Sequence, residues 1–289
     1  MLTHAVRPHG RSRQALYNLV AFAILTLGAL PAVWIIFTAF RPASEVNTTP
    51  PIWIPQQITL DAFASLFGLN PDYAAGVPVG DYMRNSIIVA TMSTVVALAL
   101  GTMGGYAFSR FEFKGHRLVF LLIMLSRAVP GIALSLPLFL LLRNFGLVDT
   151  VGGLSFVYVA VNTPFSVWLM DGFFRQIPRD LDESAYIDGC GYWTAFLRVD
   201  LPLALPGMGA AGIFAFLAAW NEYQLASLLT RTPAAKTFPV GLYDFTSQFT
   251  VDWRGMCAMS VLMMIPAILF VIGTQRSMVR GLTFGAIKG

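Results

Sequence analysis

A cluster of acidic residues is the part of the sequence best equipped for a specific chemical interaction. The segment from Pro178 to Pro202 contains Asp180, Asp182, Glu183, Asp188 and Asp200, a third of the 15 acids of the chain. This acidic segment lies between two long apolar runs, so we expect it at a membrane face. Short cytoplasmic loops between membrane helices are usually rich in Lys and Arg. A carboxylate-rich loop is better suited to pairing with a basic protein groove than to resting on anionic lipid.

The acidic segment also carries the signals of a short helix. Pro178, Asp180 and Asp182 suit a first turn, because proline lacks a donor that is unused there and carboxylates favour the positive end of the helix dipole. Gly189 suits the end of the helix with a positive φ. A second short helix is predicted at about residues 192–198, running into Leu201-Pro202. The helical period predicts two faces of the first helix, one with Leu181, Ser184, Ala185 and Asp188 and one with Asp180, Glu183 and Ile187.

Arg127 and Glu222 fall deep inside apolar runs, where an unpaired charge is costly. One interpretation is that they line a polar translocation path, to which Asn162 and Asn221 are weaker candidates. The other is that each charge pairs locally, with the other charge or with a partner subunit, or reaches a membrane interface. The sequence leaves both interpretations open.

The sequence lacks the motifs of a catalytic or metal site. A phosphate-binding loop requires a Gly-Lys pair, and Lys114, Lys236 and Lys288 follow Phe, Ala and Ile. No HExxH or GxSxG pattern occurs, and every histidine lies outside the apolar runs. Cys190 and Cys257 are in separate segments without metal-ligand spacing. We therefore expect no catalytic residue, no metal and no cofactor bound by this chain, and the energy for any transport must come from elsewhere.

Composition predicts an all-α membrane protein with six transmembrane helices. Of 289 residues, 56% are hydrophobic and 12% charged, and the mean hydropathy is +0.66, whereas roughly a quarter of the residues in soluble domains are charged. The net charge of +4 does not indicate nucleic-acid binding, because the basic residues flank apolar runs. Each run is long enough to cross about 30 Å of hydrocarbon. The expected spans are about residues 15–40, 85–108, 118–142, 154–174, 207–229 and 256–274, in a transmembrane region 15–278 with a loop at 175–206 and tails at 1–14 and 279–289.

Three smaller features accompany these spans. Gly101, Gly104 and Gly105 in the second span would let a neighbouring helix approach closely. The polar, proline-rich segment 41–81 is expected to be an external loop with one short helix near residues 61–67. The later loop, residues 237–253, is more apolar than a solvated loop requires.

That later loop could enter the cleft of a partner protein, turning at Gly241 and displacing water with its aromatic tip, or it could fold back as a lid or lie in the lipid interface. The contact candidates are Gly241, Tyr243, Phe245, Ser247 and Gln248.

The distribution of basic residues predicts the orientation in the membrane. With six spans both termini lie on one side. That side, which includes the acidic segment, holds twelve of the 19 Lys and Arg; the other face holds six, and Arg127 lies in a span. The positive-inside rule therefore places both termini and the acidic segment in the cytoplasm.

The spacing within the acidic segment resembles a known coupling motif. Glu183-Ser184-Ala185, three residues, Gly189, nine residues, Val199, one residue and Leu201-Pro202 look like the EAA motif of permease subunits in binding-protein-dependent ABC importers, with Ser184 and Val199 as conservative departures. The resemblance implies a short helix that docks into the partner ATPase and transmits its closure. The implied coupling residues are Asp182, Glu183, Ser184, Ala185, Asp188, Gly189, Leu201 and Pro202.

The resemblance covers nearly the whole chain from about Leu16. Residues 220–223, 237–242 and 281–289 look like the second permease of carbohydrate importers of the maltose-transporter type. That family has a type I ABC importer transmembrane domain in the bacterial inner membrane. The resemblance implies a related but non-identical permease partner, a dimer of ATPase subunits that bind ATP and Mg, and an extracytoplasmic sugar-binding protein reached by the loop 237–253.

The main hypothesis is therefore a non-catalytic permease subunit that imports a sugar or sugar derivative. An ABC permease for a non-sugar solute is the first alternative. A stand-alone secondary transporter is the second, although internal repeats and several paired acids near midplane would then be expected.

Overall fold

The computed structural model describes residues 11–69, 76–247 and 250–284, and these residues form helices and connecting loops without a β-strand. The chain divides into two compact units, one made of residues 1–75 and 251–261 and the other of residues 76–250 and 262–289. The two units are described separately below. Within the described residues, five helices are long and apolar enough to cross a membrane, and a sixth span is possible if a bent helix pair counts as one.

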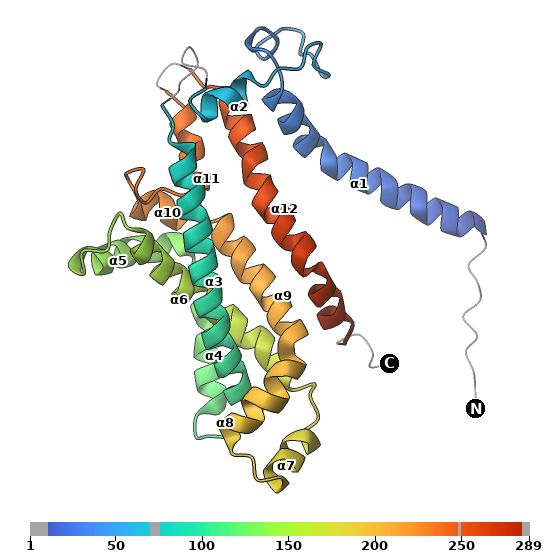
Figure 1. The fold of residues 1–289 in the computed structure, drawn as a ribbon, viewed down its shortest axis with the longest axis vertical. Coiled ribbons are helices and arrows are strands. Elements are labelled where there is room, and N and C mark those ends of the chain that lie inside the picture. The colour runs from blue at the N-terminus through green and yellow to red at the C-terminus, as the bar shows by residue number, and fades with distance from the viewer. Residues whose placement is uncertain (1–10, 70–75, 248–249, 285–289) are drawn as a thin grey trace. The chain divides into compact units, whose positions relative to one another are not determined.

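Three long helices form the centre of the larger unit: α3 (Val79–Arg110), α6 (Val151–Phe174) and α9 (Leu201–Trp220). Each packs against the other two, as Figure 1 shows. A Cβ atom on Gly105 would lie 2.6 Å from the backbone nitrogen of Asp171, and one on Gly101 would collide with Ser166. The predicted close helix approach at these glycines is therefore confirmed, between α3 and α6.

A buried apolar cluster holds this bundle together near the carboxyl end of α9. Trp220 stacks on Phe216 at 5.7 Å between ring centroids, and Phe216 stacks on Phe270 at 4.0 Å. The Trp220 indole N–H donates to the carbonyl of Met263 at 3.1 Å. These contacts attach the later part of α12 (Trp253–Phe284) to α9.

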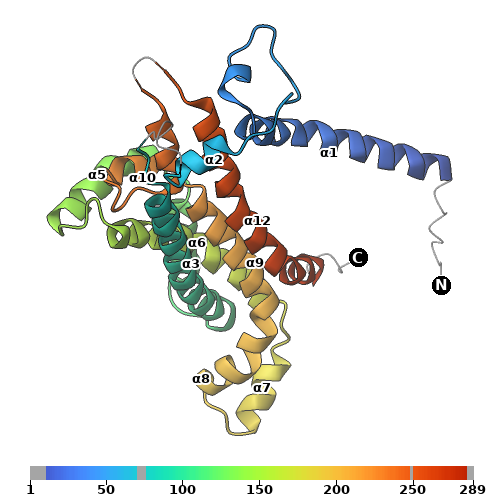
Figure 2. The ribbon, with the colours of Figure 1, turned by 45° about the horizontal axis from the view of Figure 1, so that its top comes forward.

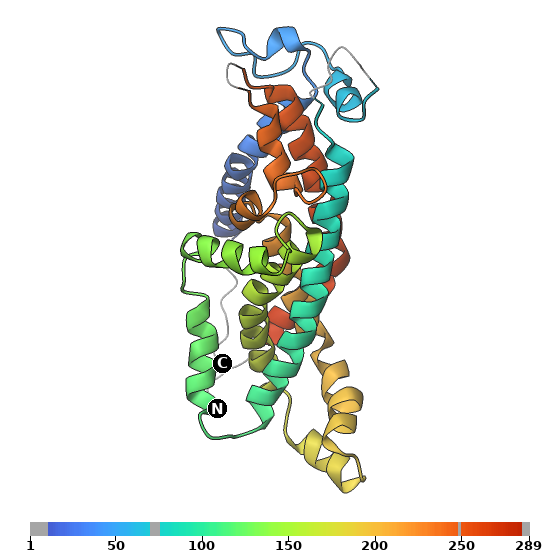
Figure 3. The same ribbon diagram turned by 90° about the vertical axis from the view of Figure 1, so that its left-hand side faces the viewer.

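The predicted span 118–142 is broken in the structure and is not one continuous helix. It consists of α4 (His116–Ser126) and α5 (Gly131–Asn144), which meet at 94° (Figure 3). Pro130 precedes α5 in an extended conformation (φ −58°, ψ 132°). Proline cannot donate the helical hydrogen bond and disfavours helix in the residue before it, so the helix breaks here.

The predicted span 207–229 also differs from the structure. The helix begins earlier, because α8 (Tyr192–Ala195), η3 (Phe196–Asp200) and α9 form one continuous span from Tyr192 to Trp220. It ends at Trp220, and α10 (Gln224–Leu229) is a separate helix that packs on α5. The first and last predicted spans correspond to α1 (Arg11–Ala39) and α12, so helix extends into both predicted tails.

The smaller unit contains α1, η1 (Ala43–Glu45), α2 (Asp61–Leu66) and residues 251–261, which include the start of α12. The predicted short helix near residues 61–67 is confirmed. Arg41 is buried here: its guanidinium lies 4.6 Å from the ring centroid of Trp34 and donates to the carbonyl of Trp53 at 2.8 Å. The Arg254 guanidinium donates to the Arg41 carbonyl at 3.1 Å.

Candidate functional site

The acidic segment forms a short helix, α7 (Asp180–Ile187), that projects with α8 from one end of the bundle (Figure 2). Gly189 has a φ of 85°, as predicted. The Gly189 N–H donates to Tyr186 and the Cys190 N–H donates to Ala185, at 3.0 and 2.9 Å. This pair of bonds is a Schellman motif, which ends the helix at a glycine.

The inward face of α7 differs from both faces predicted from the sequence. Asp182 and Ala185 are the buried residues of the helix, whereas Glu183, Ser184 and Asp188 are exposed. The side chain of Ile187 is 86% exposed. The helix therefore buries Asp182, whereas the side chains of Glu183 and Ile187 face outward.

Asp182 is buried because it pairs with Arg110 at the end of α3. The Arg110 Nε atom lies 2.8 Å from Asp182 Oδ2, and its Nη2 atom lies 2.9 Å from Asp200 Oδ1. Both guanidinium Nη atoms also reach the carbonyl of Ile177 at 3.3 Å. We call Arg110, Asp182 and Asp200 the Arg110 cluster; it joins α7 to α3 and to the start of α9.

Asp200 reaches Arg110 from a short π-helical stretch. The segment η3 has π-helical hydrogen bonding, and the Leu201 N–H donates to the carbonyl of Phe196, five residues earlier. Pro202 follows and has no N–H for a regular helical bond to Arg198. An i to i−5 turn changes the direction in which the next side chains point, and here Asp200 is fully buried.

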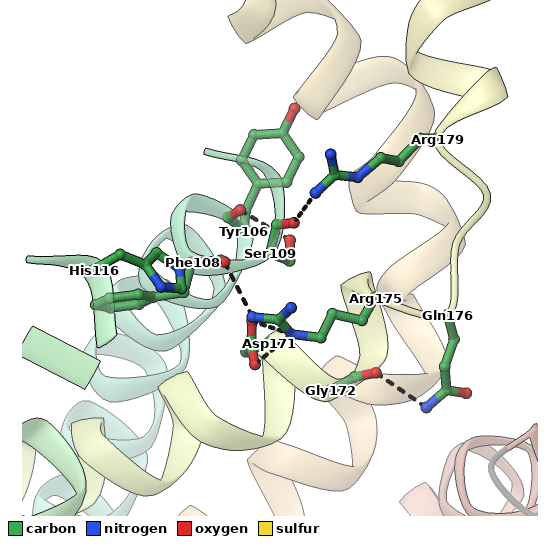
Figure 4. Close-up of polar contacts among 9 residues, drawn as sticks. All are labelled: Tyr106, Phe108, Ser109, His116, Asp171, Gly172, Arg175, Gln176 and Arg179. Atoms are coloured by element: carbon green, nitrogen blue, oxygen red, sulfur yellow. Dashed lines mark hydrogen bonds and ion pairs between the residues drawn. The ribbon is translucent and has the colours of Figure 1, made fainter. Parts of the chain in front are cut away.

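Cationic side chains also cap the carboxyl end of α3. Arg175 pairs with Asp171 at 2.9 Å and donates to the carbonyl of Phe108 at 3.3 Å, and Arg179 donates to the carbonyl of Ser109 at 3.1 Å (Figure 4). Cations are favourable at this end of a helix, because its last carbonyls lack helical partners. The carboxyl end of α6 and the segment that leads into α7 are therefore attached to the last turn of α3.

A second group of polar residues surrounds a cavity of about 370 Å³ inside the bundle. Its lining includes Arg127, Tyr158, Asn162 and Glu222, so the structure brings together three of the four residues predicted for a translocation path. Asn221 does not line it; its side chain donates to the carbonyl of Leu217 at 2.9 Å.

Within the described residues, the two intramembrane charges bond to nearby neutral groups rather than to each other. Glu222 accepts the N–H groups of Leu225 at 2.7 Å and Ala226 at 3.0 Å, and it accepts the Tyr158 hydroxyl. Glu222 therefore caps α10. Arg127 lies at the break between α4 and α5, where it donates to the carbonyl of Val161 at 3.1 Å. Both still face the cavity, so the two interpretations of the sequence are compatible.

The loop after α10 is largely packed against the bundle rather than free. It forms α11 (Phe238–Gly241) and η4 (Leu242–Phe245), and Gly241 and Phe245 are buried. Tyr243 is 61% exposed and stacks on Tyr223 at 5.0 Å. Ser247 bonds to Thr250. Gln248 lies outside the described residues.

Polar contacts with the first turns of α3 hold this loop in place. Asp244 accepts from the hydroxyl of Tyr82 at 2.5 Å and from Lys236 at 2.8 Å. The Asn85 side chain donates to two loop carbonyls, and Ser86 accepts the Phe238 N–H at 2.7 Å. These contacts pack the described part of the loop up to Phe245 against α3, while Tyr243 stays exposed.

Several residues that build these sites were missed by the sequence reasoning. The sequence does not single out Arg110 or Tyr158, and it marks Asp200 only as one acid of the segment. A basic residue at the last position of a span, with acids in the next loop on the same membrane face, is a usable signal for the Arg110 cluster. No sequence pattern indicates the π-helical stretch that turns Asp200 inward.

Comparison with known proteins identifies the family. The family described as binding-protein-dependent transport system inner membrane component matches residues 97–283. The chain belongs to this family.

A trehalose transport system permease protein of Mycobacterium tuberculosis (strain CDC 1551 / Oshkosh) is 36% identical, over 97% of this chain and 100% of the relative. A sulfoquinovosyl glycerol transport system permease protein of Agrobacterium fabrum (strain C58 / ATCC 33970) is 32% identical, over 96% and 95%. A bacterial ABC transporter for import of the acidic polysaccharide alginate contains a chain with the same fold, with a TM-score of 0.76 and 21% identity over 94% of this chain and 99% of that chain.

The predicted resemblance and fold class are thus confirmed. The chain is a multi-pass, all-α permease of a binding-protein-dependent ABC importer, with the type I importer transmembrane fold. The roles of individual residues in the acidic segment, the cavity and the external loop stay predictions.

Proposed function

We propose that this permease imports a sugar or sugar derivative and takes its energy from partner ATPase subunits that act on the acidic segment. The main support for this mechanism is the way α7 is held on the protein. Its residues Glu183 and Ile187 are exposed, while Asp182 pairs with Arg110. Support for the substrate class comes from the relatives, which include trehalose and sulfoquinovosyl glycerol permeases.

The proposed assembly contains a related permease, a dimer of ATPase subunits and an extracytoplasmic solute-binding protein, all in or at the bacterial inner membrane. Both termini and the acidic segment are cytoplasmic in this proposal, in agreement with the positive-inside rule. This chain is non-catalytic, and ATP and Mg bind to the ATPase subunits. We infer that ATP binds to the partner subunits because this sequence contains no Gly-Lys phosphate-binding loop.

The structure suggests a division of roles among the predicted coupling residues. Glu183, Ser184, Asp188 and Pro202 are exposed and can contact an ATPase, whereas Asp182 and Ala185 are buried and would position the helix. Gly189 ends the helix, and Leu201 begins α9. The solute would pass along the cavity lined by Arg127, Asn162 and Glu222, and the loop around Tyr243 would meet the binding protein.

Substitutions in α7 test the proposed coupling. Glu183→Ala removes an exposed charge expected to pair with a basic ATPase residue, and Gly189→Asp places a side chain at φ 85°. Both should abolish ATP-driven uptake by the reconstituted complex while leaving membrane insertion intact. The matched control is Glu112→Ala, an exposed acid outside the segment, which should transport normally. Wild-type uptake by the Glu183→Ala and Gly189→Asp complexes would contradict the proposed coupling role.

A further inference from the structure

The Arg110 cluster contains an imbalance that the proposed coupling role does not explain. Two carboxylates share one guanidinium, and the side chains of Arg110, Asp182 and Asp200 are 6%, 6% and 0% exposed. With both acids ionised the cluster carries one uncompensated negative charge. A buried ion cluster of this kind is stable only when its charges and hydrogen-bonding atoms all have partners.

Two oxygen atoms of the cluster lack a donor. Asp182 Oδ1 and Asp200 Oδ2 are buried and accept no hydrogen bond from any described residue. The opposite oxygens, Asp182 Oδ2 and Asp200 Oδ1, are those that contact Arg110. An unsatisfied buried acceptor is destabilising, and a proton placed between two neighbouring carboxylates turns one of them into a donor for the other.

We propose that Asp182 and Asp200 share a single proton, and that this proton and Arg110 together position α7 on α3 and α9. The proton comes from water and bonds to one carboxylate oxygen, which then donates to the other acid. The cluster becomes neutral, because one carboxylate, one carboxylic acid and one guanidinium remain. Asp182 and Asp200 are thereby positioning residues, and the effect on transport rests on the proposed coupling function.

The surroundings of the cluster favour this protonation. The pKa of Asp182 is raised to about 6, chiefly by burial; the neighbouring carboxyl of Asp200 acts in the same direction, and Arg110 and Arg179 act against it. Tyr106 of α3 and Tyr186 of α7 are the other titratable groups beside the pair. Neither tyrosine supplies a positive charge, so Arg110 and the more distant Arg179 are the cations that oppose the proton.

The raised pKa fixes the direction of the pH dependence. An aspartate in an unfolded chain has a pKa near 3.9, so between about pH 4 and about pH 6 the folded cluster holds a proton that the unfolded chain has lost. The contribution to stability is complete below about pH 4 and is lost as the pH rises through about 6. Above that pH the two ionised acids repel each other, and α7 is held less firmly.

Infrared spectroscopy of the purified full chain tests the shared proton without any transport assay. We expect a protonated-carboxyl band that is present below about pH 6 and lost above it, and that is absent from both Asp182→Asn and Asp200→Asn. Asp180→Asn, an exposed acid in the same helix, should retain the band. Absence of the band in the wild type, or its persistence in both cluster variants, would overturn the proposal.

A second measurement tests the positioning role in the assembled complex. We expect the ratio of wild-type to Asp200→Asn ATP hydrolysis rates to change through about pH 6, because the variant has only one carboxylate on Arg110. A constant ratio would exclude the positioning role. If the chain did not assemble with an ATPase, the proposed function would fail while the infrared band could still be present, so the two failures can be told apart.

Discussion

At the scale of single residues, the glycines of α3 determine how closely two membrane helices pack. Gly105 lies against the backbone of Asp171 and the side chain of Met170, the residues that lead to the Arg175 contacts with the end of α3. Small residues at such crossings allow backbones to approach, which is a main source of stability for helices in lipid. The close packing at Gly105 therefore stabilises the bundle and also the start of the acidic segment, which follows Arg175.

Gly105→Ala is expected to destabilise the protein by about 1–3 kcal/mol, because the added Cβ would lie 2.6 Å from backbone and side-chain atoms. Gly172→Ala in α6 is the matched control, since nothing lies within 4 Å of its Cβ position. The free energy of unfolding can be measured in detergent by chemical denaturation. Equal stability of Gly105→Ala and the wild type would contradict the close crossing of α3 and α6.

Asp149 is a second residue with a specific structural task. It has a positive φ of 59° and accepts the N–H groups of Arg231 at 2.7 Å and Thr232 at 3.0 Å, as well as the Thr232 hydroxyl. Burial alone would raise its pKa, but these hydrogen bonds outweigh burial and lower the pKa. The ionised carboxylate therefore fastens the turn before α6 to the segment after α10.

Asp149→Asn keeps a residue that tolerates positive φ but removes the charge, so we expect a loss of about 1 kcal/mol near neutral pH. Because the folded pKa is lowered, the stabilisation is present above the unfolded value of about 3.9 and is lost as the pH falls through the folded value. The difference in unfolding temperature between wild type and variant should thus shrink in acid. A difference that is constant with pH would contradict the role of the charge.

At the scale of helices, the sequence predicts those features that depend on residues close to one another in the chain. The helix at Asp180–Ile187, its end at Gly189 and the glycine crossing of α3 follow from spacing alone. Pro130 is a sequence signal for the break between α4 and α5. The length of the apolar run nevertheless favoured one span across it. The end of α9 at Trp220 could not be predicted, because it depends on Glu222 capping α10 and on the distant Tyr158.

The contact loop at residues 237–253 was predicted from its aromatic content, and its burial depends on partners remote in sequence. Phe245 is buried beside the Asp244 contacts to Tyr82 and Lys236, whereas Tyr243 points outward. Tyr243→Cys should therefore react quickly with a polar thiol reagent, and Phe245→Cys should react slowly. We expect the solute-loaded binding protein, added to the reconstituted complex with trapped ATP, to protect Tyr243→Cys. Labelling that is unaffected by binding protein and nucleotide would exclude this loop from the contact.

At the scale of the whole molecule, the projecting acidic segment is joined to the helix bundle that contains the cavity. The cavity around Glu222 lies in the bundle, and the acidic segment projects from one end of it. The Arg110 cluster links the projecting helix to α3 and α9, two of the three helices that form the bundle. A displacement of α7 would therefore be transmitted to α9, which lines the cavity with Ala218 and Ala219.

Purification of the affinity-tagged chain, expressed together with its neighbouring genes, is the most direct test of the central claim that an ATPase partner works through the exposed face of α7. An ATP-binding subunit should copurify, the complex should hydrolyse ATP in lipid nanodiscs, and the chain alone should not. Ile187→Asp, which replaces an 86% exposed apolar side chain, should release that subunit while Glu112→Ala retains it. Solute accumulation by the chain alone under a proton or sodium gradient, or full retention of the ATPase by Ile187→Asp, would contradict the claim.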